Sequence, residues 1–258
     1  MEPIFFSTAE ILRFVIVLTR ISGIMILAPF FSHQLFPAQV KIAFALVAAS
    51  VMAPSLPLNR VPADVGLGSV AMIVFGELCV GLVLGFAALC VFAGLQFAGQ
   101  VISFQLGFSL INLIDPQTNV ESTVFSFLYG SIGMLFFLLI NGHHWFLQAI
   151  NESFGLLGVG GIPIQKPLIE QIVQMSAQLF VIGIRIAGPI LAVTVITDVL
   201  IGIVGRTAPQ INILIVGMPL KLLVGFGCMS FSLYFLPPYL DDVFSTLSKT
   251  LFSLVHAI

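Results

Sequence analysis

The sequence predicts an all-α protein whose helices cross a membrane. Hydrophobic residues make up 59% of the 258 residues, the mean hydropathy is +1.16, and only 8% of the residues are charged. Soluble domains carry about 25% charged residues. Helices satisfy every backbone group within their own segment, which a lipid environment requires. We expect one integral-membrane domain over residues 1–258, with kinked or broken helices and helical hairpins.

Six apolar blocks define the expected helices. A helix needs about 20 apolar residues to cross a bilayer core, so the blocks at 11–30 and 122–140 fit one crossing each. Pro54 and Pro57 close the second block early. The fifth block, at 172–204, would run about 50 Å at 1.5 Å per residue, which is too long for one straight crossing. In order, the blocks cover residues 11–30, 40–56, 69–98, 122–140, 172–204 and 211–236.

Proline interrupts the last two blocks. Gly188-Pro189 lies in the fifth block and Gly217-Met218-Pro219 in the sixth. Proline removes a backbone donor and its ring clashes with the preceding turn, so we expect kinked or broken helices there. Carbonyl groups freed in lipid need partners in neighbouring protein, which indicates packing inside a larger helical assembly.

The third block carries small residues at helical spacing. Gly81 and Gly85 form a GxxxG motif, and Gly94 and Ala98 repeat its spacing. Small residues let helix backbones approach each other closely. The pattern favours packing within the chain, with packing against another subunit as the alternative.

Several ionisable residues lie within or beside apolar blocks. A lone charge at the bilayer centre costs at least about 2.5–3.5 kcal/mol, so these groups imply mutual pairing, a water-filled lumen, or surroundings other than lipid. We favour structural pairing, with Arg185 or Arg206 as the partner of Asp198, and keep a transport role as the alternative. The residues concerned are Glu77, Arg185, Asp198, Arg206 and Lys221.

A neutral polar stripe lies at the end of the third block. Gln96, Gln100 and Ser103 follow one another at i, i+4 and i+7, which places them on one helical face. Such a stripe suits hydrogen bonding between helices or the wall of a wet channel.

The sequence offers no catalytic constellation. It contains no HExxH, GxSxG or nucleotide-binding loop, so we expect no enzymatic activity, no cofactor and no metal. The adjacent His143 and His144 are badly placed to share a metal and are typical of a turn at the membrane interface, with a ligand or proton site as the alternative. A net charge of −2 without a basic cluster argues against nucleic acid as a partner.

The segment QLGFSLINLIDPQTNVE, residues 105–121, separates the third and fourth blocks. Asp115-Pro116 stops a helix because the residue before proline is pushed out of the α region, and Gly107 lets the backbone turn. Irregular backbone at membrane depth survives only inside protein or beside a cavity. Residues 104–121, the plug segment, are therefore either a plug that seals a pore or a buried packing loop. The apolar side chains expected to form the seal are Phe104, Phe108, Leu110 and Ile111.

Three stretches resemble the FliR family, an export-gate component of flagellar type III secretion whose pattern is shared by virulence-system relatives. Together they cover most of the chain from Gly94 to Gly227, and the third is the most specific. Residues 117–121 depart from the glycine-containing sequence that many members have after Asp-Pro. The stretches are GQVISFQLGFSLINLIDPQTN, NGHHWFLQAINESF and DVLIGIVGRTAPQINILIVGMPLKLLVG.

The resemblance implies a gated conduit in the bacterial inner membrane, at the flagellar basal body. FliP-like and FliQ-like subunits would join this chain in a funnel of helices that passes unfolded substrate proteins, with an FlhB-like switch protein as a further partner. In the family, the Asp-Pro segment acts as a plug in the closed pore, here about residues 104–121. An injectisome subunit, a secondary transporter and a purely structural scaffold remain as alternatives.

Overall fold

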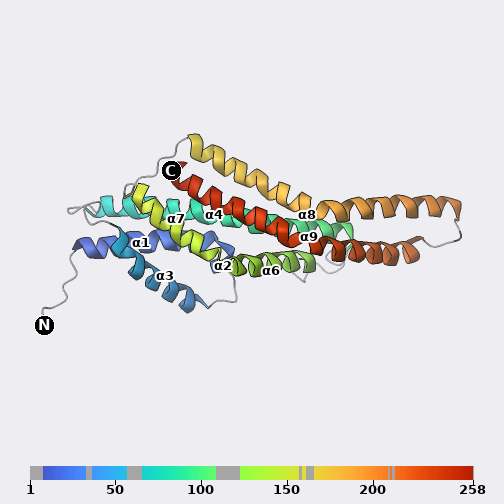
Figure 1. Ribbon diagram of the computed structural model, residues 1–258, viewed down its shortest axis with the longest axis horizontal. Helices are drawn as coiled ribbons and strands as arrows, with labels where there is room; N and C mark the ends of the chain where they lie inside the picture. Colours follow the sequence, from blue (N-terminus) through green and yellow to red (C-terminus); the bar gives the residue numbers. More distant parts are fainter. Residues whose placement is uncertain are drawn as a thin grey trace. The chain divides into compact units, whose positions relative to one another are not determined.

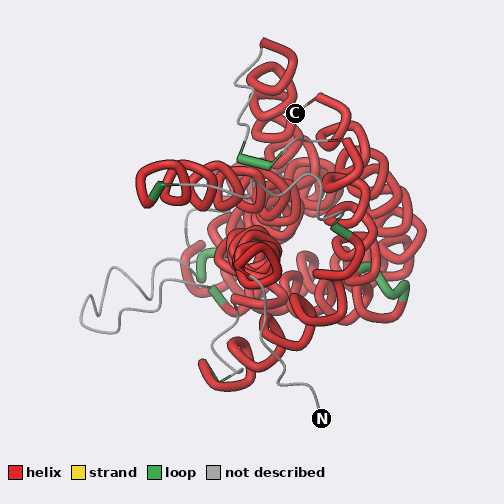
Figure 2. Tube along the Cα trace, turned by 90° about the vertical axis from the view of Figure 1, so that its left-hand side faces the viewer, coloured by secondary structure: helices red, strands yellow, loops and turns green. Residues whose placement is uncertain are grey.

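The computed structural model describes residues 8–32, 37–56, 66–108, 123–156, 159–160, 166–208, 210 and 213–257. Over these ranges the chain is helical and contains no strand, as the sequence predicts and as Figure 2 shows. The chain divides into two compact units. Unit 1 comprises Met1–Cys90, Ile140–Met175 and Ser245–Ile258, and unit 2 comprises Val91–Leu139 and Ser176–Phe244.

Six helices, α1, α3, α4, α6, α8 and α9, follow the six apolar blocks in order, whereas α7 and the part of α9 after residue 236 lie outside the predicted blocks (Figure 1). By length and composition, α4, α8 and α9 can each cross a membrane. The helix α3 ends just before Pro54, as predicted, and a single 3₁₀ turn follows it. The elements are α1 (Thr8–Leu27), α2 (Pro29–Ser32), α3 (Ala38–Met52), η1 (Ala53–Ser55), α4 (Leu67–Gln105), α6 (Val124–Leu139), α7 (His143–Leu156), α8 (Lys166–Thr207) and α9 (Ile213–Ala257).

The two longest helices continue through the prolines that interrupt the apolar blocks. The 42 residues of α8 include Pro189, and the 45 residues of α9 include Pro219, Pro237 and Pro238. At 1.5 Å per residue these helices run about 63 and 68 Å, roughly twice the thickness of a bilayer core. Each of these two helices is therefore longer than an upright helix needs to be to cross the bilayer once.

The helix does break between α6 and α7. Together these two helices are long and apolar enough to cross a membrane, but only as a bent pair. Asn141 has a positive φ of 56°, and the carbonyl groups of Asn141 and Gly142 accept from the N–H groups of His144 and Trp145. His143 and His144 thus lie in the first turn of α7, with ring centroids 4.3 Å apart. In the described ranges no three potential metal ligands gather at one place.

In unit 1, α1 packs closely against the first half of α4. A Cβ atom added at Gly85 would lie 2.9 Å from the carbonyl oxygen of Ile24, and one added at Gly81 would collide with the carbonyl oxygen of Arg20. On the α1 side, a Cβ at Gly23 would lie 2.7 Å from the carbonyl oxygen of Leu78. The GxxxG motif at Gly81 and Gly85 therefore faces a helix of the same chain.

In unit 2, the second half of α4 packs against α6 and α8. A Cβ atom at Gly94 would lie 2.9 Å from the carbonyl oxygen of Leu179 in α8, and Ala98 is fully buried. The rings of Phe92, Phe137 and Phe244 meet with centroids 5.5–5.8 Å apart. Gly94 and Ala98 thus serve packing within unit 2.

Candidate functional site

The end of α4 in unit 2 is defined by a glycine turn. Gly107 has φ +87°, a left-handed conformation that glycine adopts without steric cost. The N–H of Phe108 donates to the carbonyl of Ser103 at 3.0 Å, and the N–H of Gly107 donates to that of Phe104 at 3.1 Å. This pair of bonds is the Schellman motif. The chain therefore leaves α4 in a fixed direction just before residue 109.

Three phenylalanines, which we call the aromatic cluster, hold together the chain on both sides of residues 109–122. The ring of Phe108, which follows α4, lies 5.3 Å from that of Phe125 in the first turn of α6. Phe226 of α9 lies 6.4 Å from Phe108 and 5.9 Å from Phe125. Such ring pairs contribute about 0.5–1.5 kcal/mol beyond the area they bury. The plug segment therefore starts near the point where α6 begins.

The start of α6 is fixed by side-chain hydrogen bonds. The Thr123 Oγ1 accepts from the N–H of Ser126 at 3.2 Å, the bond of a helix N-cap. The Ser126 hydroxyl in turn donates to the carbonyl of Gln96 in α4 at 3.0 Å. These bonds position Phe125 within the aromatic cluster.

A second group, the polar cluster, joins three helices of unit 2. One carboxylate oxygen of Asp198 in α8 accepts from Lys221 Nζ of α9 at 2.7 Å and from Gln105 Nε2 of α4 at 3.3 Å. The Asp198 side chain is 45% exposed and that of Lys221 is 21% exposed. This ion pair therefore lies at the surface of the chain, and it ties the last residue of α4 to both long helices.

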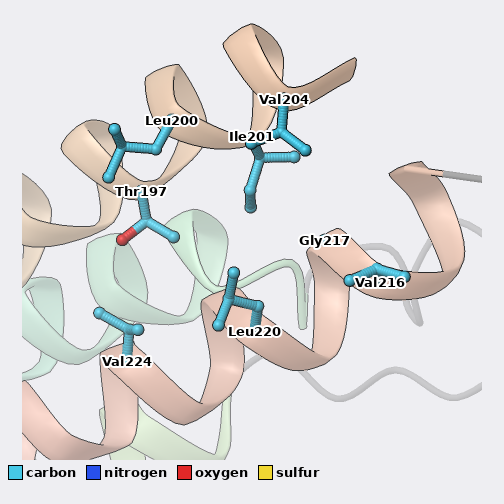
Figure 3. Close-up of a pocket in the computed structure, with 8 residues that line it drawn as sticks. All are labelled: Thr197, Leu200, Ile201, Val204, Val216, Gly217, Leu220 and Val224. Carbon is cyan, nitrogen blue, oxygen red and sulfur yellow. The ribbon is translucent and has the colours of Figure 1, made fainter. Parts of the chain in front are cut away.

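An apolar groove of about 300 Å³ lies between α8 and α9 beside the polar cluster. Figure 3 shows Thr197 and Ile201 on α8 facing Leu220 and Val224 on α9. The hydroxyl of Thr197 donates to the carbonyl of Val193 within its own helix, so it offers no free donor to the groove. The eight residues that line the groove are Thr197, Leu200, Ile201, Val204, Val216, Gly217, Leu220 and Val224.

Only part of the predicted seal lies in the described residues. Phe104 is 73% exposed, Gly107 forms the turn at the end of α4, and Phe108 belongs to the aromatic cluster. The remaining predicted plug residues, Leu110, Ile111, Asp115 and Pro116, lie outside the described residues.

The predicted polar stripe is divided by burial. Gln96 and Gln100 are exposed, whereas Ser103 is fully buried and its hydroxyl has no hydrogen-bond partner among the described residues. Gln96 also lies against α6, since a Cβ atom at Gly130 would be 3.3 Å from its Cγ. The three residues therefore do not form one continuous exposed surface.

In unit 1, Glu77 takes part in a buried network that we call the buried ion cluster. Arg20 Nε and Nη2 donate to one oxygen of Glu77 at 2.6 and 2.5 Å, and both side chains are 1% exposed. The other Glu77 oxygen accepts from the N–H of Gly160 at 3.1 Å. Arg20 also donates to the Ser153 hydroxyl at 2.6 Å and lies 3.9 Å over the ring of Phe154. The cluster joins α1, α4, α7 and the turn at 159–160.

The remaining charged residues differ from the sequence-based expectation. The ion-pair partner of Asp198 is Lys221, so the prediction that it pairs with Arg185 or Arg206 is wrong. Arg185 is exposed and hydrogen-bonds the Tyr239 hydroxyl of α9. Arg206 is exposed in the last turn of α8.

Sequence reasoning did not identify Arg20 as the partner of Glu77 or Lys221 as the partner of Asp198, although the sequence contains an indication of each pair. Arg20 is a charge inside an apolar run, like Glu77, and has the opposite sign. Asp198 and Lys221 are about equally far from residue 210, the middle of the connection between α8 and α9. Residues at equal distances from a hairpin turn lie opposite each other, so this arithmetic selects Lys221 rather than Arg206.

Comparison with known proteins places the chain in a family. The family described as bacterial export proteins, family 1, matches residues 11–247. The flagellar biosynthetic protein FliR of Bacillus subtilis is 32% identical over 254 residues, which cover 95% of each chain. FliR of Escherichia coli is 28% identical over 93% of this chain and 92% of its own. FliR of Aquifex aeolicus is 28% identical over 83% and 82%. The chain therefore belongs to family 1 of the bacterial export proteins, the family of the FliR proteins.

Proposed function

We propose that this chain is a subunit of the flagellar type III protein export gate, in the bacterial inner membrane at the flagellar basal body. FliP-like and FliQ-like subunits complete the conduit, an FlhB-like protein acts as its switch, and unfolded proteins pass through it. Family membership and three helices fit to cross a membrane support this function. The relatives compared above are all named as flagellar proteins, which favours the flagellum over an injectisome.

The aromatic cluster carries the proposal for the plug. The rings of Phe108 and Phe125, which flank residues 109–122, meet with centroids 5.3 Å apart, so side-chain contact holds the end of α4 to the start of α6. A segment with both ends fixed at one place can fill a passage without pulling on the helices that hold it. Bulky apolar side chains in a constriction resist water and ions. We propose that residues 104–121 seal the closed gate in this way.

The proposed role is non-enzymatic. The chain guides and seals, and the work of moving substrate comes from partner proteins or from the membrane potential. The contact between α8 and α9 is consistent with such a role. It consists of a partly exposed ion pair in the polar cluster and of the apolar residues of the groove.

Ion conductance of the assembled gate tests the plug. The complex with its FliP-like and FliQ-like partners is reconstituted in a planar bilayer, either intact, with Phe226→Ala, or without residues 108–112. We expect the intact gate to be closed, the deletion to conduct, and Phe226→Ala to conduct part of the time because it loosens the support of Phe108. Phe231→Ala is the matched control, since Phe231 is an exposed α9 phenylalanine outside the aromatic cluster.

The alternatives give different results in the same assay. If the deletion leaves the barrier intact and abolishes assembly, the segment is a structural scaffold and not a plug. If uptake of a small solute by cells is lost while export of flagellar proteins continues, the chain is a transporter. Disruption of the gene is expected to remove exported flagellar proteins from the culture medium.

A further inference from the structure

Leu106, the residue that follows α4, is seated in a hole on α9. Its side chain is 4% exposed. A Cβ atom added at Gly225 would collide with Leu106 Cδ2, and it would lie 3.6 Å from Thr194 Cγ2 of α8. All three residues belong to unit 2. The hole therefore exists because position 225 carries no side chain.

Both long helices shape this hole for an apolar side chain. The Thr194 hydroxyl donates to the carbonyl of Ile190 at 2.7 Å within its own helix, so the methyl group of Thr194 is left to line the hole. Glycine in a helix interior is less favourable than alanine, and Gly225 is buried. The space that Leu106 needs gives a physical reason for glycine at position 225.

The chain turns immediately after Leu106. A Cβ atom added at Gly107 would lie 3.9 Å from Met218 Cε of α9, and the ring of Phe108 lies 6.4 Å from that of Phe226. The turn and both of these contacts come directly after the seated leucine. We call residues 105–108 the root of the plug segment, since they set the direction in which that segment leaves α4.

Leu106 makes the strongest contact between the root and the two long helices. The bond from Gln105 to Asp198 is long, at 3.3 Å, and exposed. Met218 is 46% exposed, and methionine side chains are flexible. Withdrawing a buried leucine loses more free energy than breaking an exposed hydrogen bond. The position of the root therefore depends mainly on Leu106.

We propose that Leu106 is the residue that positions the plug segment, and that the hole at Gly225 receives it in the closed gate. This inference rests on the proposed function, because it names the contact that keeps the proposed plug in place. A shift of α9 against α4 removes Leu106 from the hole and moves the plug segment with it. The position of α9 is in this way linked to the state of the gate.

The test changes the hole and its occupant separately and together. Gly225→Val fills the hole, and Leu106→Ala removes the side chain that occupies it. The double variant keeps the packed volume, because valine adds to glycine as many carbon atoms as the change from leucine to alanine removes. Gly227→Val is the matched control, since Gly227 is exposed in the same helix and its Cβ position is open. Valine favours helix over glycine, so a leak cannot come from a weaker α9.

Conductance per assembled complex is the main measurement. Each full-length variant is assembled with the FliP-like and FliQ-like subunits of the same organism, and native mass spectrometry gives the assembled fraction. In planar bilayers we expect Gly225→Val to raise the conductance of the closed gate at least tenfold and Leu106→Ala at least fivefold, with assembled fractions within twofold of the wild type. The double variant and Gly227→Val should stay within twofold of the wild-type conductance.

Amide hydrogen exchange reports on the root without relying on conductance. The N–H groups of Gly107 and Phe108 are bonded in the turn at the end of α4. In the assembled complex their exchange should be at least tenfold faster in Gly225→Val and should return to within twofold of the wild type in the double variant. Exchange of the Ser126 N–H, which is capped separately by Thr123, should change less than twofold.

Three results would overturn the proposal. The first is wild-type conductance and exchange in both Gly225→Val and Leu106→Ala. The second is a double variant that leaks as much as either single variant, which would mean that the fit between the two positions does not matter. The third is a leak that appears only in proportion to loss of the complex, which would assign Leu106 to general packing. If Gly225→Val does not assemble, conductance and exchange of Leu106→Ala decide alone.

Failure of the proposed function would look different. If the gate without residues 108–112 stays closed, the segment is not a plug, whereas faster exchange at Gly107 and Phe108 in Gly225→Val would still identify Leu106 as the residue that positions the root. If that deletion conducts but Gly225→Val and Leu106→Ala stay closed with wild-type exchange, the plug stands and the role of Leu106 is wrong.

Discussion

The buried ion cluster of unit 1 and the polar cluster of unit 2 use the same chemistry at very different degrees of burial. Arg20 and Glu77 are each 1% exposed, whereas Lys221 and Asp198 are 21% and 45% exposed. Charges attract more strongly where water is excluded, but breaking a buried pair leaves an uncompensated charge that water cannot reach. The first pair is therefore costly to disturb and the second is cheap.

The difference teaches which pair holds structure and which can change. Arg20 contacts Glu77, Ser153 and the ring of Phe154 at once, so the arginine can leave only if several segments separate. Asp198 uses a single oxygen for both of its partners, so either bond can break without separating the helices. We expect the buried ion cluster to set the stability of unit 1 and the polar cluster to contribute little to the stability of unit 2.

Removing the charge of Glu77 should have the largest effect. Glu77→Gln keeps the shape of the side chain but leaves the Arg20 guanidinium buried without a counter-charge, which costs about 3–5 kcal/mol. At about 2–4 °C per kcal/mol, the midpoint of thermal unfolding in detergent should fall by roughly 6 °C or more. Glu152→Gln, on the exposed side of α7, should leave it unchanged. Equal midpoints for the two variants would show that the buried pair does not stabilise unit 1.

The double variant Arg20→Leu, Glu77→Leu sharpens that result. Apolar residues often replace a buried ion pair without loss, so most of the stability should return. A double variant no more stable than Glu77→Gln would mean that the bonds to Ser153 and Gly160 matter more than the charge pair.

Filling the closest helix contact should come next. Gly81→Ala places a Cβ atom against the carbonyl oxygen of Arg20, and overpacking of this kind costs about 1–3 kcal/mol. Gly68→Ala is the control in the same helix, because its Cβ position is open and alanine favours helix. Unfolding midpoints of the two variants should move in opposite directions. A stabilising Gly81→Ala would contradict the close contact between α1 and α4.

The cap of α6 should give a smaller loss. Thr123→Ala removes the acceptor for the N–H of Ser126, which costs about 1 kcal/mol. Amide hydrogen exchange should rise in the first turn of α6 and stay unchanged in α7. Thr207→Ala serves as the control. Thr207 is the last residue of α8, so this variant should leave amide hydrogen exchange in α6 as in the wild type.

Neutralising Asp198 should have the smallest effect on stability. Partly exposed ion pairs contribute about 0–1 kcal/mol, so Asp198→Asn should shift the unfolding midpoint by no more than roughly 2–4 °C. A shift as large as that of Glu77→Gln would erase the distinction between the two clusters. If both Asp198→Asn and Arg185→Gln assemble normally but abolish export, these residues act in transport and not in structural pairing.

Much of the fold follows from the sequence, because long apolar blocks become helices in lipid; α7 and the end of α9 after residue 236 lie outside those blocks and were not predicted. Helix ends were harder to predict. Pro189 and Pro219 mark breaks in the pattern, yet α8 and α9 continue through them, since one missing donor does not outweigh the bonds on both sides. The break between α6 and α7 instead depends on the positive φ of Asn141, a conformation that asparagine adopts more readily than most residues.

Less of the candidate site follows from the sequence, because sequence gives the sign of a charge and not its distance to another. Asp198 was recognised as needing a cation, but the prediction chose Arg185 or Arg206 because it did not use the pairing of α8 with α9 across their connection, which brings Lys221 opposite Asp198. Arg20 was not singled out, since its partner is 57 residues away. The role of Gly107 was easier to foresee, because only local backbone geometry decides it.

The closeness of Phe108 and Phe125 has a consequence for evolution. Because the rings of Phe108 and Phe125 are in contact, with centroids 5.3 Å apart, inserting or deleting residues between them need not move either helix, and doubling the length of a loop costs only about 0.6 kcal/mol of closure entropy. A change in the length of this insert is thus compatible with the frame of α4, α6 and α9 that presents it.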